Sequence, residues 1–294
     1  MTHSLPDSAS APERLAALLS RRAAVAAPGC HDALGALLVA EAGFEAVSLS
    51  GYSVAASHGK PDIGLIGGTQ MATHAGALAA ATPLPVVADA DTGYGGIANI
   101  AETVRAYERQ GVAALHLEDQ QNPKRCGAMA TKTLVSDVEM AQRLRAALAA
   151  RRELLVIGRT DALTLMGLSE AIRRCQRMAD AGADAVMVPS LSSLEDIEAV
   201  VKAVPVPVLH TVAETVRPLF TQQQLASTGL GMALYSISLI QAIVQLQRRI
   251  LATLRNDGTT APFVDAMLPL AQLSELLGAA THAAFENRIL TAKG

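Results

Sequence analysis

Short apolar runs alternate with longer alanine-rich segments along most of the chain. Each run is too short for a core helix and apolar enough for a strand that is buried on both faces, as in parallel sheets. The predicted strands are 24–28, 46–49, 85–89, 113–118, 154–159, 184–188, 206–209 and 231–234.

The segments between these runs predict helices. Gly43, Gly111 and Gly182 each stand between such a segment and the next apolar run, where a glycine commonly ends a helix. The predicted helices are 12–22, 32–42, 69–81, 97–110, 136–150, 168–181, 193–203, 221–227 and 237–256, with further helical sequence over 262–290.

Eight successive strand–helix units indicate an α/β protein built as a (β/α)8 barrel, the TIM-barrel architecture. The alternative is a doubly wound open sheet, but no GxGxxG pattern follows the first strand, which disfavours a dinucleotide-binding fold. We expect a disordered tail over 1–11, a barrel domain over 12–260, and an extra helical extension over 261–294.

Composition narrows the class of protein. Half of the 294 residues are hydrophobic, which is enough for a large core, and the net charge of −3 argues against a nucleic-acid partner. Three cysteines, an odd number, do not suggest a disulfide framework. The N-terminal residues are polar and no run is long enough to span a membrane, so we expect a cytoplasmic protein without a membrane partner.

Polar residues gather where the predicted strands end. The matching N-terminal ends are mostly Ala, Pro and Gly, and the active sites of barrel enzymes lie at the C-terminal face. This asymmetry predicts an enzyme. The residues at or just after the strand ends are Ser50, Gly51, Asp89, Asp91, Glu118, Asp119, Arg159, Asp161, Ser190, His210 and Tyr235.

Four carboxylates are expected to lie close together. Asp89 and Asp91, within ADADTGYGG, are two residues apart and share one face of a strand; Glu118 ends the next strand, and Asp62 follows the second. Such a cluster would repel itself without a cation, and oxygen ligands favour Mg²⁺, with Mn²⁺ as a substitute. The alternative is an Asp-Gly turn with Asp91 as a helix cap, and Asp119 is interpreted as a cap.

One cysteine has the surroundings of a reactive thiol. Cys126 follows Lys124 and Arg125 in a polar loop, and neighbouring cations lower the pKa of a thiol. The other two, Cys30 and Cys175, lie in apolar surroundings and are expected to be inert.

Several motifs in combination resemble the isocitrate lyase and phosphoenolpyruvate mutase superfamily, from Pro28 to about Asn287. The resemblance implies a barrel whose C-terminal helix is exchanged with a neighbouring subunit, usually in a homotetramer, so that 261–294 would pack on that neighbour. The motifs are LSG (49–51), PDIG (61–64), VADADTGYG (87–95), LHLEDQ (115–120), NPKRCG (122–127), GRTDA (158–162), PLFT (218–221) and MALY (232–235).

The resemblance also implies roles for single residues. Asp89 would bind the metal directly, and Asp62, Asp91 and Glu118 would reach it through water. Cys126 would donate a proton, since KRCG is typical of the 2-methylisocitrate lyase-like members. The residues that would contact the carboxylate substrate are Ser50, Gly51, Tyr52, Arg159, Ser190 and Thr211.

Four positions depart from the methylisocitrate lyase pattern. Ala128 stands where those lyases have histidine, Ser190 where they have glutamate, and Thr211 where they have asparagine; Ser48 replaces a tyrosine, which leaves the base for the substrate hydroxyl open. We expect a Mg²⁺-dependent lyase that cleaves a 2-hydroxy di- or tricarboxylate, such as a methylisocitrate or an alkylmalate, to pyruvate or glyoxylate and a carboxylate. The alternatives are a carboxyphosphonoenolpyruvate phosphonomutase-like protein, an oxaloacetate hydrolase or decarboxylase, and a non-catalytic barrel.

Overall fold

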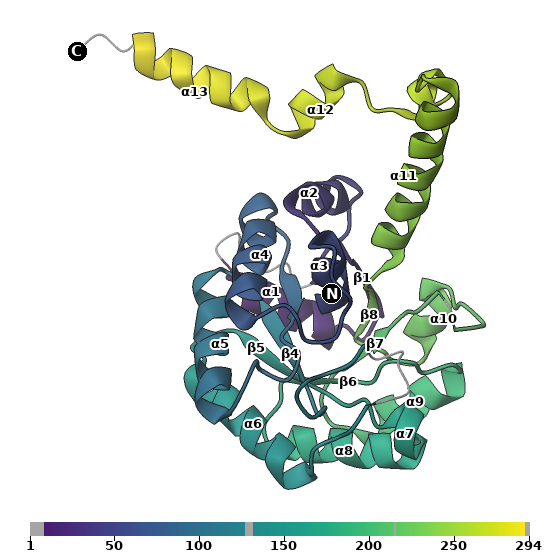
Figure 1. Cartoon of the computed structure of the whole chain (residues 1–294). Helices are drawn as coiled ribbons and strands as arrows, with labels where there is room; N and C mark the ends of the chain where they lie inside the picture. Colours follow the sequence, from purple (N-terminus) through teal and green to yellow (C-terminus); the bar gives the residue numbers. More distant parts are fainter. Residues whose placement is uncertain (1–8, 127–131, 215, 292–294) are drawn as a thin grey trace. The chain divides into compact units, whose positions relative to one another are not determined.

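Eight parallel strands surround a common axis in the computed structural model of the chain (Figure 1). The structure describes residues 9–126, 132–214 and 216–291. The strand order is β1-β8-β7-β6-β5-β4-β3-β2, and a bridge between Gly29 and Ser48 joins the two outer strands, so the barrel is nearly closed. The strands are β1 (Val25–Pro28), β2 (Val47–Leu49), β3 (Val86–Asp89), β4 (Ala114–Glu118), β5 (Leu155–Arg159), β6 (Ala185–Met187), β7 (Val208–Thr211) and β8 (Met232–Tyr235).

Helices follow the strands and cover the outside of the barrel (Figure 1), which confirms the predicted (β/α)8 architecture. Two short helices, α3 and α7, were not predicted. The helices of the barrel are α1 (Ala11–Ser20), α2 (Ala33–Glu41), α3 (Gly51–Ser57), α4 (Gly68–Ala81), α5 (Ile97–Arg109), α6 (Asp137–Ala150), α7 (Leu163–Met166), α8 (Leu168–Asp180), α9 (Leu194–Ala203) and α10 (Gln222–Ser227), and α11 (Ser238–Asp257) follows β8.

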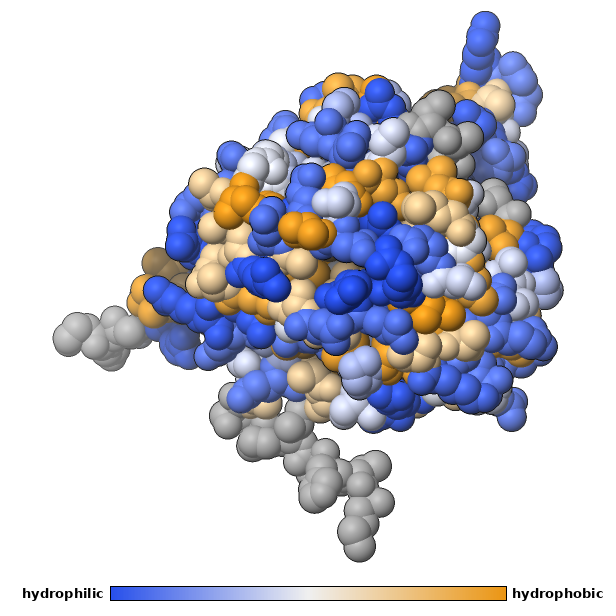
Figure 2. Space-filling view, turned by 90° about the horizontal axis from the view of Figure 1, so that it is seen from below, coloured by the Kyte–Doolittle hydropathy of each residue, from blue (hydrophilic) through white to orange (hydrophobic). Residues whose placement is uncertain are grey.

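The strand residues alternate between two apolar cores. Val87, Ile157 and Leu209 pack inside the barrel, whereas their neighbours Val86 and Val156 pack against the surrounding helices. Truncating a leucine in such a core to alanine typically costs about 2–5 kcal/mol. On the face seen in Figure 2, hydrophilic and hydrophobic residues are interspersed, as is usual for a solvent-facing surface.

Glycines end three of the helices, as predicted. Gly43, Gly111 and Gly182 have φ of 81°, 77° and 100°, a left-handed conformation that a side chain would disfavour. At the other end of two helices, Ser136 and Ser193 accept hydrogen bonds from backbone N–H groups of the first turn.

The strand register brings the polar strand ends together. Asp89 on β3 lies opposite His116 on β4, and Glu118 on β4 lies opposite Arg159 on β5. Three neighbouring strands therefore present charged side chains at one edge of the barrel.

The chain divides into two compact units, 1–240 and 241–294, so the boundary lies within α11, whereas the sequence analysis placed it after 260. The second unit contains the rest of α11, η1 (Ala261–Ala266), α12 (Leu270–Leu276) and α13 (Ala279–Thr291). Residues 261–291 are apolar and long enough to cross a membrane by composition, but breaks between η1, α12 and α13 divide them.

Candidate functional site

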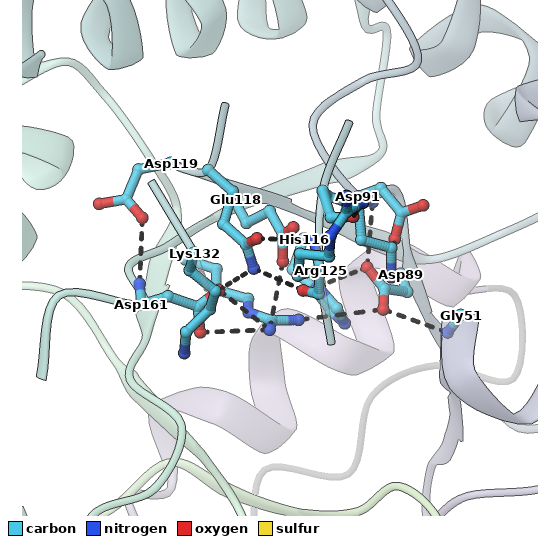
Figure 3. Close-up of polar contacts among 12 residues, drawn as sticks. Gly51, Asp89, Asp91, His116, Glu118, Asp119, Arg125, Lys132 and Asp161 are labelled. Atoms are coloured by element: carbon cyan, nitrogen blue, oxygen red, sulfur yellow. Dashed lines mark hydrogen bonds and ion pairs between the residues drawn. The ribbon is translucent and has the colours of Figure 1, made fainter. Parts of the chain in front are cut away.

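The candidate site lies at the C-terminal ends of β3, β4 and β5, beside the N-terminus of α3 (Figure 3). Asp89 is buried there, and each of its carboxylate oxygens accepts a backbone hydrogen bond: Oδ2 from Gly51 N at 3.1 Å and Oδ1 from Asp91 N at 3.0 Å. A Cβ at Gly51 would lie 3.1 Å from Asp89 Oδ2 and 3.2 Å from Asp91 Oδ1. The close approach of α3 to the acids therefore favours glycine at position 51.

The segment after β3 turns through a left-handed backbone. Asp91, Gly93 and Tyr94 have φ of 46°, 88° and 59°, a conformation that costs free energy for residues with a side chain. Tyr107 on α5 donates a hydrogen bond to the backbone oxygen of Asp89 at 2.7 Å. Asp91 does not cap a helix, because Gly96 holds the N-cap position of α5.

Lys124 is the cation nearest to two of the predicted metal ligands. Its buried ammonium forms an ion pair with Asp62 and lies 2.9 Å from Asp91 Oδ1. Burial alone would lower the pKa of this ammonium, but Asp91, Asp89 and Glu118 raise it. The lysine is therefore charged, and the acid cluster is a partner for it that could not be foreseen from its position beside Cys126 in the sequence.

Arg159 faces three carboxylates. Its Nη2 lies 3.2 Å from Glu118 Oε2 and donates to both oxygens of Asp161, and its Nη1 is 3.9 Å from Asp89 Oδ2. The Nε of Arg159 is buried and has no hydrogen-bond partner among the described residues. A substrate carboxylate could therefore accept hydrogen bonds from this guanidinium without displacing all of its partners.

The buried acids outnumber the cations that face them. Asp62, Asp89, Asp91, Glu118 and Asp161 form ion pairs with Lys124 and Arg159, and the buried Lys132 places a third positive charge near Asp161. Burial, and next the charge of Asp89, raise the pKa of Asp91 to about 7. Burial also raises the pKa of Glu118, whose Oε1 has no hydrogen-bond partner within the described part of the chain.

This excess of negative charge fits an added divalent cation. Among the described residues, no three His, Cys, Asp or Glu side chains form a preformed metal cage. Mg²⁺ does not need such a cage, because it commonly keeps several waters and takes only one or two carboxylates. The donor set, with an unpaired Glu118 oxygen, therefore suits a hydrated magnesium ion.

Two residues of the site, His116 and Gln120, were not predicted as functional candidates, and Asp161 was predicted only as a polar residue after a strand end. His116 Nδ1 lies 3.4 Å from Asp89 Oδ1, and burial lowers the pKa of the imidazole to about 4, so it is neutral at pH 7. Gln120 and Asp161 join the same network through a 2.7 Å hydrogen bond. The alternation of residues along β4 places His116 on the face of Glu118, which was a usable signal.

Asp119 is a correction to the prediction of a helix cap. It is completely buried and accepts hydrogen bonds from Thr160 Oγ1 at 2.6 Å, the Asp161 backbone N–H at 3.0 Å and Arg174 Nη1 at 3.0 Å. Ser136, not Asp119, caps the following helix α6. Asp119 therefore fixes the backbone just after β5, next to Arg159.

The cysteines differ as the sequence analysis expected in their exposure. Cys126 is partly exposed, whereas Cys30 and Cys175 are buried and burial raises the pKa of each thiol to about 12. Gly127 and Ala128, the next two residues in sequence, lie outside the described residues.

The remaining candidates lie at other points of the rim. Ser50 caps α3 and accepts a hydrogen bond from Tyr52 N at 3.2 Å, and Tyr52 is exposed. Ser190, Thr211 and His210 line one small cavity together with apolar side chains. Thr211 ends β7 instead of following it, and its buried Oγ1 has no hydrogen-bond partner in the described ranges.

His210 packs as a structural residue. Its Nδ1 lies 3.4 Å from the backbone oxygen of Val188, and burial lowers its pKa to about 4. Ser48 is buried in β2.

Comparison with known proteins then identifies the family. The sequence profile described as phosphoenolpyruvate phosphomutase matches residues 15–255. The chain belongs to this family. It is 37% identical over 265 residues to a 2,3-dimethylmalate lyase of Eubacterium barkeri, covering 89% of this chain and 92% of that protein.

Other relatives in the superfamily carry different activities. The chain is 36% identical over 266 residues to a 2-methylisocitrate lyase of Halalkalibacterium halodurans, covering 90% of this chain and 89% of that one. Oxaloacetate acetylhydrolase in complex with 3,3-difluorooxalacetate superposes with a TM-score of 0.90 at 33% identity, covering 95% and 97% of the two chains. Phosphonopyruvate hydrolase in complex with oxalate and Mg²⁺ gives 0.86 at 31%, covering 96% and 100%.

Proposed function

We propose that this protein is a Mg²⁺-dependent carbon–carbon lyase that cleaves a 2-hydroxy dicarboxylate of the alkylmalate kind to a 2-oxo acid and a carboxylate. The observation that carries the proposal is Arg159, a buried guanidinium with an unpaired Nε directly beside an acid cluster with surplus negative charge. The similarity to a 2,3-dimethylmalate lyase and to a 2-methylisocitrate lyase, over about nine-tenths of the chain, supports it.

Asp89 would hold the magnesium ion, with Asp62, Asp91 and Glu118 as further partners through water. The similarity to phosphonopyruvate hydrolase, whose structure holds oxalate and Mg²⁺, supports this metal assignment. When bound, the ion would stabilise the negative charge that develops on the oxo acid portion of the substrate. With the ion bound to this protein, Lys124 would share Asp62 and Asp91 with it.

The chain's own residues would do the remaining work. Arg159 would bind the substrate carboxylate through its free N–H groups, together with backbone and side-chain groups of Ser50, Gly51 and Tyr52. Bond cleavage leaves an enolate-like carboxylate, and Cys126 would supply the proton that it needs. The partial exposure of Cys126 agrees with a thiol that meets substrate.

A second candidate is hydrolysis or decarboxylation of oxaloacetate. The TM-score of 0.90 to oxaloacetate acetylhydrolase favours it, as does the small Ser190 on the β6–β7 side of the rim. A panel assay that couples pyruvate and glyoxylate release to a dehydrogenase, with oxalate measured separately, decides between the two. Pyruvate or glyoxylate from alkylmalates supports the lyase, and oxalate from oxaloacetate alone contradicts it.

We also propose a cytoplasmic homotetramer in which the C-terminal helices pack on a neighbouring subunit. Leu251, Leu270 and Leu290 in the second unit are 63%, 78% and 82% exposed, which is unusual for leucines without a covering partner. Light scattering after gel filtration tests the assembly. A monomer at micromolar concentration would contradict it.

A further inference from the structure

We infer that Gln120 is a positioning residue. It fixes the backbone of the segment that carries Cys126 relative to Arg159, the arginine proposed to bind the substrate carboxylate. The inference rests on the proposed function and deepens it, because it names what places the proton donor. Gln120 follows Asp119 at the end of β4 and is 1% exposed.

The side-chain amide of Gln120 forms two hydrogen bonds with the backbone of one loop residue, Arg125. Its Oε1 accepts a hydrogen bond from Arg125 N at 2.9 Å, and its Nε2 donates to Arg125 O at 2.9 Å. The side-chain amide thus pairs with both backbone polar groups of Arg125, as a neighbouring strand would. Cys126 is the next residue, so this contact fixes the peptide from which the thiol projects.

The same amide also reaches the substrate side of the site. Its Nε2 donates a second hydrogen bond to Asp161 Oδ2 at 2.7 Å, and Asp161 accepts from Arg159 Nη2 at 3.2 and 3.3 Å. A primary amide has two N–H donors, and both are used here. A continuous chain of hydrogen bonds therefore leads from Arg159 to the backbone that precedes Cys126.

The base of this arrangement is anchored. The backbone oxygen of Gln120 accepts a hydrogen bond from Arg143 Nη1 at 2.8 Å. Gln120 also bridges to Leu134 in antiparallel fashion, and Gln121 N donates to Thr133 O at 2.8 Å. Gln121 and Thr133, on either side of the loop, are therefore paired next to Gln120, and Arg143 of α6 holds the backbone of Gln120.

The chemistry of the contact requires glutamine. Glutamate has no N–H to donate and would place a second charge beside Asp161, while lysine and arginine have no acceptor for Arg125 N. Asparagine carries the same groups but is one methylene shorter. We therefore expect Gln120 to affect delivery of the proton more than binding of the metal.

The test uses Gln120→Met and Gln120→Asn in the full-length protein, with Gln121→Met as the matched control, since Gln121 is the exposed neighbour of the same type. Four quantities are measured: kcat and KM for the best alkylmalate, Mg²⁺ affinity by calorimetry, the thermal unfolding midpoint, and the rate of Cys126 alkylation by iodoacetamide with and without oxalate and Mg²⁺. A general acid contributes on the order of 10²–10⁴-fold, so misplacing it should lower kcat at least about tenfold.

We expect both Gln120 variants to lose kcat with KM and Mg²⁺ affinity within about threefold of wild type, and to lose the protection of Cys126 by oxalate. Gln121→Met should behave as wild type. Near-normal kcat with protection intact overturns the inference, as does a parallel loss of Mg²⁺ affinity, an equal effect of Gln121→Met, or failure of both Gln120 variants to fold. The alkylation rate is measured without turnover. The inference about Gln120 can therefore be tested even if the protein proves not to be a lyase.

Discussion

The two sides of the barrel rim differ in the charge of their side chains. Over β3–β5, buried carboxylates and cations contact one another, as in the ion pair between Arg159 and Glu118. Over β6 and β7, the corresponding positions are Ser190 and Thr211, which share a cavity with apolar side chains such as Phe220.

This difference separates two tasks on one scaffold. Charged groups that lie 3–4 Å apart in a buried site act strongly on one another, and such a site can hold a metal ion and an anion. An uncharged wall offers little to a second carboxylate but does not penalise an alkyl group. We therefore interpret the β3–β5 side as the site of chemistry and the β6–β7 side as the determinant of substrate size.

The largest expected effect comes from removing the central acid. Asp89→Ala deletes the carboxylate that accepts hydrogen bonds from Gly51 and Asp91, and we expect catalytic activity to fall by a factor on the order of 10³ or more as metal is lost. Electron paramagnetic resonance would measure Mn²⁺ binding, and circular dichroism would show whether the variant is folded. The exposed Asp180→Ala is the control, and a folded variant that binds Mn²⁺ like wild type would contradict the role.

A conservative change at the arginine should have the next largest effect. Arg159→Lys keeps the positive charge between Glu118 and Asp161 but loses the planar fork, so we expect kcat/KM to fall about tenfold to hundredfold. The stability of the protein should change less than with a neutral residue, which would leave buried acids uncompensated. Steady-state kinetics and urea unfolding measure the two effects, and unchanged kcat/KM would show that substrate does not meet this side chain.

The uncharged side predicts substrate preference. Ser190 and Thr211 lack the charge and the amide found in methylisocitrate lyases, and each missing contact to a buried carboxylate costs roughly 1–3 kcal/mol. We expect kcat/KM for 2-methylisocitrate to be about tenfold to hundredfold lower than for a substituted malate. The double change Ser190→Glu with Thr211→Asn should reduce this difference. A wide preference for methylisocitrate in the unmodified protein would contradict this.

The smallest effect concerns stability and pH. Burial lowers the pKa of His210 to about 4, below its value of about 6.5 in the unfolded chain, so the unfolded state binds more protons as the pH falls. The stability that His210 contributes is complete above pH 6.5 and is lost between about pH 6.5 and pH 4, by about 2 kcal/mol at pH 5.

Urea unfolding at pH 7 and pH 5 measures this loss, and His210→Gln should lose less stability than wild type over the same interval. His116, whose pKa burial also lowers to about 4, remains in both proteins and cancels in the comparison. An equal loss in the two proteins would show that His210 is not the source.

The barrel and the position of the acids could be predicted from sequence, because both follow from short-range pattern. Parallel strands buried on both faces are apolar runs, and Asp89, Glu118 and Arg159 end three of them. Since the C-terminal ends of such strands meet at one face, their proximity follows from the fold class.

The partners that lie in loops could not be predicted in this way. Lys124 reaches Asp62 across 62 positions in sequence, and a loop without periodicity does not indicate where a flexible side chain points. For the same reason Asp119 was interpreted as a local cap, although its acceptors are used by Thr160 and Arg174. Short helix α3 was missed because the strand and the helix join directly at Ser50.

Removal of divalent ions is the decisive test of the proposed magnesium site. The protein is stripped of divalent ions, assayed with a substituted malate for release of pyruvate or glyoxylate, and assayed again after Mg²⁺ or Mn²⁺ is added. We predict that activity vanishes on chelation and returns with either ion, because the five acids of the cluster over β3–β5 carry more negative charge than Lys124, Lys132 and Arg159 balance. Full activity in exhaustively chelated protein would contradict the account.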